Sequence, residues 1–227
     1  SINLEIIMYE NLKKIIQSSK TPNFLGDKNK VLSRNESMNL INNIANAIDS
    51  NLPKTRNQRS IAILLKRNVN YIASIFAIWQ LGDYFIPLNE DWPLEHKKKI
   101  IKLCKPDLII NEKFNSNFKT KQLVINELLL LRNKIIFSDK VTWKKKRNLS
   151  TIAYVIFTSG SSGEQKGVVI SKKAYKSYIN WSRKFFAGFR NNKALIITAE
   201  LTFDISLGDL AFALANNPWK SFLDALG

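Results

Sequence analysis

A ten-residue segment, 158–167, concentrates the groups that could hold a chain of phosphates. It reads Thr-Ser-Gly-Ser-Ser-Gly-Glu-Gln-Lys-Gly, so it contains three of the eight glycines in this 227-residue chain. Small side chains let backbone N–H groups approach phosphate oxygens closely, while the hydroxyls and the Lys166 ammonium add donors and charge. The segment therefore predicts a polyanion-binding loop rather than a plain surface hairpin.

Three known loop patterns do not fit this segment. A Walker A loop needs glycine where the chain has Gln165, and it is followed by a helix, whereas residues 168–170 are typical of a strand. The dinucleotide pattern Gly-x-Gly-x-x-Gly is absent, and Gly-Ser-Ser-Gly is one residue short of a nucleophile elbow. The same four residues are similar to the core of the serine amidases, which use paired serines and a lysine. A serine amidase-like hydrolase is therefore an alternative.

The elements that must position this loop follow from hydrophobic periodicity and from start and stop signals. Strands are expected at 60–65, 84–88, 107–110, 123–125, 152–157, 168–170 and 195–198, with a small hairpin over 24–32. Helices are expected at 2–19, 33–48, 69–81, 93–103, 171–186 and 203–214. Ser33 followed by Glu36 predicts a capping box, Asn68 and Ser171 predict helix caps, and Gly82 predicts a helix stop. Strand–helix–strand alternation over 60–125 indicates an α/β fold with a parallel sheet.

Composition excludes several classes of site. The single cysteine, Cys104, rules out an internal disulfide framework, and the single histidine, His96, rules out a multi-histidine metal centre. We therefore expect no metal site built from cysteine or histidine. The longest apolar stretch, 71–81, is too short to cross a bilayer, so we expect no membrane partner and a cytoplasmic location.

The net charge of +17 is uneven, because +10 of it lies in residues 93–147. A basic block of this kind is compatible with a nucleic-acid surface. Aromatic residues are not interleaved with the basic runs, as a single-strand binding platform would need. We therefore favour a solvated basic face and expect no nucleic-acid partner.

Three ordered motifs resemble those of one family. Residues 154–168 resemble the phosphate-loop signature of the adenylate-forming enzymes, with Gln165 where that family usually has proline. Residues 78–89, with Pro87-Leu88-Asn89 at their end, resemble the family's earlier motif. Phe203-Asp204-Ile205-Ser206 resembles the Phe-Asp-x-Ser motif of the amino-acid-activating branch, which includes the adenylation domains of nonribosomal peptide synthetases and the D-alanine–carrier protein ligases.

The resemblance implies a fold and a two-step reaction. The fold would be the N-terminal portion of the adenylate-forming (acetyl-CoA synthetase-like) fold, a parallel sheet flanked by helices. An amino acid would react with ATP and Mg²⁺ to give an aminoacyl-adenylate, and the acyl group would pass to the phosphopantetheine thiol of a carrier protein. The loop residues that would bind the ATP phosphates are Thr158, Ser159, Gly160, Ser161, Ser162, Gly163, Lys166 and Gly167. The residues that would bind the amino acid are Phe203, Asp204, Ile205 and Gly208.

The resemblance implies a more specific role for Asp204 and for Gly208. Asp204 would pair with the substrate's α-amino group, although an acidic residue at the start of a helix is also a common cap. Gly208 would leave room in the side-chain pocket where larger residues are common. No catalytic residue is assigned, because the adenylation lysine of the family lies in a part that this sequence does not match.

The resemblance also implies that the chain is incomplete as an enzyme. Residues 1–214 would form the N-terminal part of the large subdomain, and residues 215–227 match nothing obvious and would be a divergent or truncated tail. The chain would be an ATP-dependent, AMP-forming amino-acid ligase fragment that is inactive alone. The alternative from a different class is a truncated adenylation fold that acts as a scaffold or a carrier-protein docking module.

Overall fold

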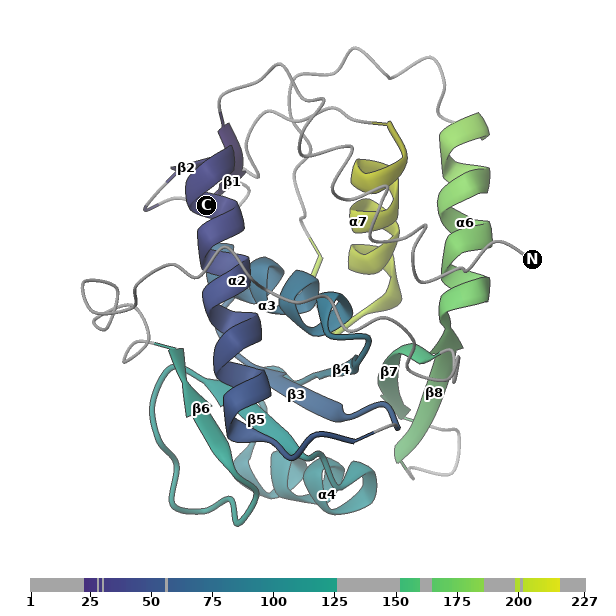
Figure 1. The fold of residues 1–227 in the computed structure, drawn as a ribbon. Helices are drawn as coiled ribbons and strands as arrows, with labels where there is room; N and C mark the ends of the chain where they lie inside the picture. Colours follow the sequence, from purple (N-terminus) through teal and green to yellow (C-terminus); the bar gives the residue numbers. More distant parts are fainter. Residues whose placement is uncertain are drawn as a thin grey trace.

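The architecture is α/β, with helices on both faces of a mostly parallel sheet (Figure 1). The computed structural model describes residues 23–27, 29, 31–55, 57–125, 152–159, 165–185, 199–200 and 202–216. The expected helix over 2–19, the expected strand over 195–198 and all but the first two residues of the expected tail over 215–227 lie outside the described residues.

A two-stranded hairpin precedes the main sheet. Strand β1 (Asn23–Gly26) pairs antiparallel with β2 (Val31–Ser33), as the sequence predicts. Ser33 then caps helix α2 (Arg34–Asn51): its side chain accepts from the Glu36 N–H, and the Glu36 carboxylate accepts from the Ser33 N–H at 2.8 Å. This reciprocal pair is the predicted capping box, and it sets where α2 begins.

The main sheet has strand order β6-β5-β3-β4-β7-β8 in the described part of the chain. Its strands are β3 (Ser60–Leu64), β4 (Tyr84–Pro87), β5 (Leu108–Asn111), β6 (Gln122–Val124), β7 (Ile152–Ser159) and β8 (Gln165–Ser171). The pairs β3–β4, β3–β5, β4–β7 and β5–β6 are parallel, whereas β8 runs antiparallel to β7. The parallel sheet predicted from residues 60–125 is confirmed, and the antiparallel edge strand β8 lies outside that stretch.

Two hydrophobic layers cover the faces of this sheet. Alternate strand residues such as Ile61 and Ile63 face helices α2 and α3 (Val69–Gln80), and the same layer reaches α6 (Lys172–Phe185) and α7 (Asp204–Asn216). Ala62 and Leu64 face the other side, where Ile100 of α4 (Leu94–Cys104) packs. Because a strand turns successive side chains to opposite faces, the near-continuous apolar run in β3 fits a strand that is buried on both sides.

Local signals fix the ends of the helix that crosses from β3 to β4. The Asn68 side chain accepts from the backbone N–H groups of Asn70 and Tyr71, so it caps α3 as predicted. Gly82 follows the helix with a φ of 77°, a conformation that glycine adopts without steric cost. The predicted cap and stop of this helix are both confirmed.

Hydrogen bonds from polar side chains link the strands at the amino-terminal edge of the sheet. Arg59 is almost fully buried, and its Nε and backbone N–H both donate to the carboxylate of Asp83 just before β4, at 2.8 and 2.9 Å. Gln58 donates to the carbonyls of Gly82 and Ile152 and accepts from the Ile152 N–H, so it joins the starts of β3, β4 and β7. With this edge occupied by structural contacts, the carboxyl edge is the side that remains for a site, as is general in open α/β sheets.

Candidate functional site

The predicted phosphate-binding loop joins β7 to β8 as a hairpin. In its register Thr158 lies opposite Lys166 and Ser159 lies opposite Gln165. The side chains of Thr158 and Lys166 are exposed at the open end of the hairpin. Gly160, Ser161, Ser162 and Gly163 lie outside the described residues. The structure therefore brings together one hydroxyl and one ammonium of the predicted set on adjacent strands, about 5 Å apart at the backbone.

Gly167 has a packing role that the sequence does not reveal. A Cβ at this position would lie 3.3 Å from Cγ1 of Val155 and 3.4 Å from the ring of Phe157. Contacts this short are tight, so a larger residue at 167 would require the side chains of Val155 or Phe157 to shift slightly. Strand packing therefore gives one reason for a small residue at this position.

Helices α6 and α7 lie side by side (Figure 1), and the predicted amino-acid-binding residues lie at the start of α7 and directly before it. Ser171 caps α6, since its side chain accepts from the Ala174 N–H at 3.1 Å. Tyr175 is buried, and its hydroxyl donates to the Leu207 carbonyl of α7 at 2.9 Å. Burial is the main reason that the pKa of Tyr175 lies well above its usual value, so this hydroxyl remains a donor. The bond fixes one helix against the other.

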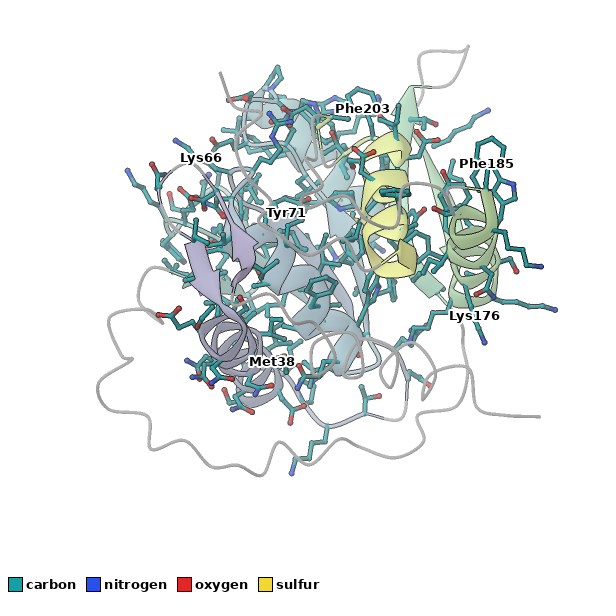
Figure 2. All side chains as sticks on the ribbon, turned by 90° about the horizontal axis from the view of Figure 1, so that it is seen from above. Met38, Lys66, Tyr71, Lys176, Phe185 and Phe203 are labelled. Carbon is teal, nitrogen blue, oxygen red and sulfur yellow. The ribbon has the colours of Figure 1, made fainter. Side chains whose placement is uncertain are left out.

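The predicted substrate-binding motif forms the start of α7. Asp204 is the first residue of the helix and is exposed, and Phe203 and Ile205 on either side of it are also exposed. The Ser206 hydroxyl donates to the Phe203 carbonyl at 2.7 Å, which fixes the turn that leads into the helix. In Figure 2, Phe203 lies at one end of α7, and Phe185 and Lys176 lie along α6. An acidic residue in the first turn also interacts favourably with the helix dipole, so Asp204 has a structural role whatever it binds.

Asp204 acts electrostatically on a tyrosine of β7. The pKa of Tyr154 is raised to about 12, mainly by burial and to a lesser degree by the charges of Asp204 and Tyr178. Tyr154 and Thr158 are four residues apart on one strand, so their side chains point to the same face, about 13 Å apart along the strand. The start of α7 and the phosphate-loop hairpin therefore belong to one side of the sheet.

The space beside Gly208 is occupied. The Tyr178 hydroxyl of α6 lies 3.1 Å from where a Cβ at Gly208 would be. Tyr178 itself is 44% exposed and stacks on Trp181, with ring centroids 5.4 Å apart. A Cβ at Gly208 would therefore meet the far end of a tyrosine of the neighbouring helix, and the room that Gly208 leaves in a side-chain pocket stays a prediction.

A pocket of about 220 Å³ opens at the carboxyl edge of the sheet, next to these residues. It is lined by the segments that follow β3 and β4, by the β1–β2 turn, and by Glu200 and Thr202 just before α7. None of the residues predicted to bind substrate or phosphate is among those that line it. The sequence did contain a signal for it, because charged residues come directly after two expected parallel strands.

The remaining candidates have ordinary roles in the described part of the chain. His96 packs edge-on against Trp92, with ring centroids 4.8 Å apart, and Cys104 is half-buried on α4. The described residues contain no group of three or more His, Cys, Asp or Glu side chains arranged to hold a metal ion. No helix within the described ranges is both long and apolar enough to cross a membrane.

Comparison with known proteins places the chain in a family. A family model described as AMP-binding enzyme matches residues 16–217. Trichosetin synthetase PKS-NRPS1 of Gibberella fujikuroi is 26% identical over 208 residues, which is 91% of this chain and 5% of that protein. The chain thus spans a small part of the length of such relatives.

Solved structures show the same fold. The N-terminal subdomain of Klebsiella oxytoca NpsA, in complex with 3-hydroxyanthranilyl-AMSN, superposes with a TM-score of 0.72 at 17% identity, over 95% of this chain and 52% of that one. VinN in complex with L-aspartate superposes with a TM-score of 0.78 at 15% identity, over 95% of this chain and 62% of that one. The expected architecture, the N-terminal part of the adenylate-forming fold, is confirmed by these likenesses.

Proposed function

The chain belongs to the AMP-binding enzyme family, and from this premise we propose that it is the N-terminal part of a domain that activates an amino acid with ATP. The product would be an aminoacyl-adenylate, and the acyl group would then pass to the phosphopantetheine thiol of a carrier protein. The observation that carries the proposal is Asp204, an exposed carboxylate that opens α7 on the same side of the sheet as the Tyr154 and Thr158 side chains. A carboxylate in this place is suited to pair with an ammonium group, which plain fatty acids lack.

The hairpin offers suitable donors to the triphosphate of ATP. Thr158 supplies a hydroxyl and Lys166 an ammonium from adjacent strands, and both side chains are exposed. ATP supplies the activated phosphorus and the leaving pyrophosphate, and Mg²⁺ would neutralise part of the phosphate charge. The role of these residues is to hold the phosphates while a substrate carboxylate, which the triphosphate repels, approaches the α-phosphorus.

The same proposal includes a statement about the isolated chain. The described residues would supply phosphate and ammonium contacts, but the segments that bind adenine and ribose and the adenylation lysine of the family are not matched by this sequence. We therefore propose that the 227-residue chain binds its ligands weakly and does not complete the reaction. Robust ATP–pyrophosphate exchange by the chain alone, with any proteinogenic or D-amino acid, would contradict this part.

Amino-group recognition can be tested without turnover. Amino acids and their deamino analogues, such as phenylalanine and 3-phenylpropionate, are titrated into the chain with ATP-Mg²⁺ while backbone NMR shifts at the start of α7 are followed. The expected result is saturable binding of at least one amino acid and none of its deamino analogue. Asp204→Asn should weaken that binding roughly tenfold, because one charge-assisted contact is lost.

Asp209→Asn, which removes a carboxylate from the same helix, is the matched control and should leave the affinity unchanged. Equal affinity for an amino acid and its deamino analogue would overturn the substrate class. If neither ATP nor any amino acid binds, the chain is better described as a scaffold built on the adenylation fold.

A further inference from the structure

The pocket at the carboxyl edge of the sheet is negatively charged in a strongly basic protein. Of the described residues that line it, four are carboxylates and two are cations: Asp27, Glu90, Asp91 and Glu200, with Lys66 and Arg67. The whole chain carries +17, so a local excess of carboxylates is not what its composition would produce on average. At a distance beyond about 8 Å the positive charges elsewhere are screened at physiological salt, and the nearby carboxylates decide what binds.

A buried hydroxyl at the wall of this pocket needs a partner. Tyr71 of α3 is 2% exposed, and within the described part of the chain its hydroxyl makes no hydrogen bond. Burial, and to a lesser degree the charge of Glu200, hold the pKa of Tyr71 far above its usual value, so the hydroxyl stays protonated. A neutral hydroxyl can both donate and accept, and leaving it unpaired in a buried place is unfavourable. Figure 2 shows Tyr71 closer to the middle of the molecule than Lys66, which lies toward the outside.

The start of α3 does not make this pocket an anion site. A helix N-terminus usually attracts anions through its unpaired N–H groups. Here the Val69 N–H already donates to the Asp27 carboxylate at 3.0 Å, and the Asn68 side chain already accepts from the N–H groups of Asn70 and Tyr71. A phosphate would therefore meet occupied donors and a carboxylate that repels it.

Two carboxylates of the pocket, Glu90 and Glu200, can accept from a further donor. Lys66 lies 3.7 Å from Glu90 and Arg67 lies 3.9 Å from Glu200, which are ion-pair distances longer than a hydrogen bond. Burial raises the pKa of the Glu90 carboxyl, the Lys66 ammonium lowers it, and the neighbouring carboxylates Glu112 and Asp91 raise it again, with a net rise. A carboxylate whose charged form is disfavoured in this way would be stabilised by an added cation.

The geometry points to a binding site for a small organic cation, with a primary ammonium head that meets the Glu200 carboxylate and the Tyr71 hydroxyl. Its aliphatic stem would lie on Leu65 and Leu88, which line the same pocket and are buried apolar residues. The volume of about 220 Å³ is below the roughly 300 Å³ at which drug-sized ligands begin to fit, so the ligand is small. The site is separate from the amino-acid and phosphate contacts and does not rest on the proposed function.

The test uses a ligand pair that differs in charge alone. Butylamine, which is an ammonium at pH 7, and butan-1-ol are titrated separately into the 227-residue chain, without nucleotide, and binding is followed by backbone NMR shifts around α3. Butylammonium should give saturable shifts at millimolar concentration, and butanol should bind at least about tenfold more weakly because it lacks the charge-assisted contact. Equal binding of the two, or saturable binding of inorganic phosphate at the same residues instead, would overturn the assignment.

Variants separate a specific site from general charge attraction. Glu200→Gln should weaken butylammonium binding roughly tenfold, and Tyr71→Phe should weaken it several-fold. Tyr71→Phe removes a hydroxyl that has no partner among the described residues, so the protein should remain folded, with unchanged or higher stability in urea. The controls are Glu95→Gln, which removes an exposed carboxylate on α4, and Tyr178→Phe, which removes a hydroxyl outside the pocket. If either control weakens binding as much as its partner variant, the proposal is wrong.

Discussion

At the scale of single residues, the chain places its polar groups in two distinct environments. Arg59 and Asp83 are buried and Gln58 is half-buried at the amino-terminal edge of the sheet, where their hydrogen bonds join the starts of β3, β4 and β7 and where Arg59 also pairs with Asp49 of α2. The exposed hydroxyl and ammonium of Thr158 and Lys166 lie past the other end of β7. The first group determines stability, and the second is available for a ligand.

The Arg59–Asp83 pair allows a test of how much the amino-terminal edge of the sheet contributes to stability. Asp83→Ala leaves the buried guanidinium with Asp49, at 3.2 Å, as its one remaining carboxylate partner among the described residues, so it should lower the free energy of unfolding by about 3 to 5 kcal/mol. Asp91→Ala, at an exposed position, should change it by less than about 0.5 kcal/mol. Urea unfolding measures both. The double variant Arg59→Met with Asp83→Leu should recover most of the loss, and a cost below about 1 kcal/mol for Asp83→Ala would contradict the role given to this pair.

Cys104 allows a clean test of burial because it is the only cysteine in the sequence. Burial raises the pKa of its thiol to about 11. Only the thiolate reacts with iodoacetamide, so at pH 8 the folded protein should be alkylated roughly a hundredfold more slowly than a thiol of ordinary pKa. The rate should rise with pH toward 11, and unfolding in urea should restore the ordinary rate. A folded-state rate equal to the unfolded one would show that the thiol is not buried as described.

At the scale of elements, most local structure follows from signals a few residues apart. The Ser33–Glu36 capping box, the Asn68 cap and the glycine at 82 are all recognisable in the sequence, because each acts on its own helix end. The antiparallel direction of β8 was not predicted, although a five-residue connection is too short for the crossover that a parallel strand needs. Loop length, rather than the apolar pattern of 168–170, carries that information.

Contacts between side chains of different elements cannot be predicted from the sequence patterns used here. The hydroxyl of Tyr178 beside Gly208 depends on how α6 packs against α7, and the burial of Tyr71 depends on the segments before α7. Neither follows from the periodicity of a single helix. For this reason the sequence predicts the residues of the candidate site from their motifs, but it does not predict the pocket at the carboxyl edge of the sheet.

The end of α4 provides a test at this scale. Lys105 follows the helix with a φ of 43°, in the left-handed region that favours glycine. Lys105→Gly should therefore raise the free energy of unfolding by up to about 1 kcal/mol. The same change at Lys102, inside the helix, should lower it by about 1 kcal/mol. Urea unfolding of both variants distinguishes the positions, and a loss of stability in Lys105→Gly would contradict the described helix end.

At the scale of the whole molecule, the chain has the fold of one part of its larger relatives. The sheet, the hairpin after β7 and the start of α7 reproduce the N-terminal part of the adenylate-forming fold, and the match covers 95% of this chain but 52% of the NpsA subdomain. The net charge of +17, in contrast, lies largely outside the motifs that carry this resemblance. Asp204 carries the proposed substrate class, and the phosphate-loop hairpin carries the proposed binding of ATP, which is the step common to the whole family.

The most direct test of that account is ATP binding by the 227-residue chain, measured by calorimetric titration with ATP-Mg²⁺. The account predicts weak, saturable binding that Lys166→Ala reduces roughly tenfold, because it removes one charge-assisted phosphate contact. Lys173→Ala, which removes an exposed lysine at the start of α6, should leave the affinity unchanged. Absence of saturable binding, or an equal loss in the two variants, would contradict the claim that this hairpin binds the phosphates of ATP.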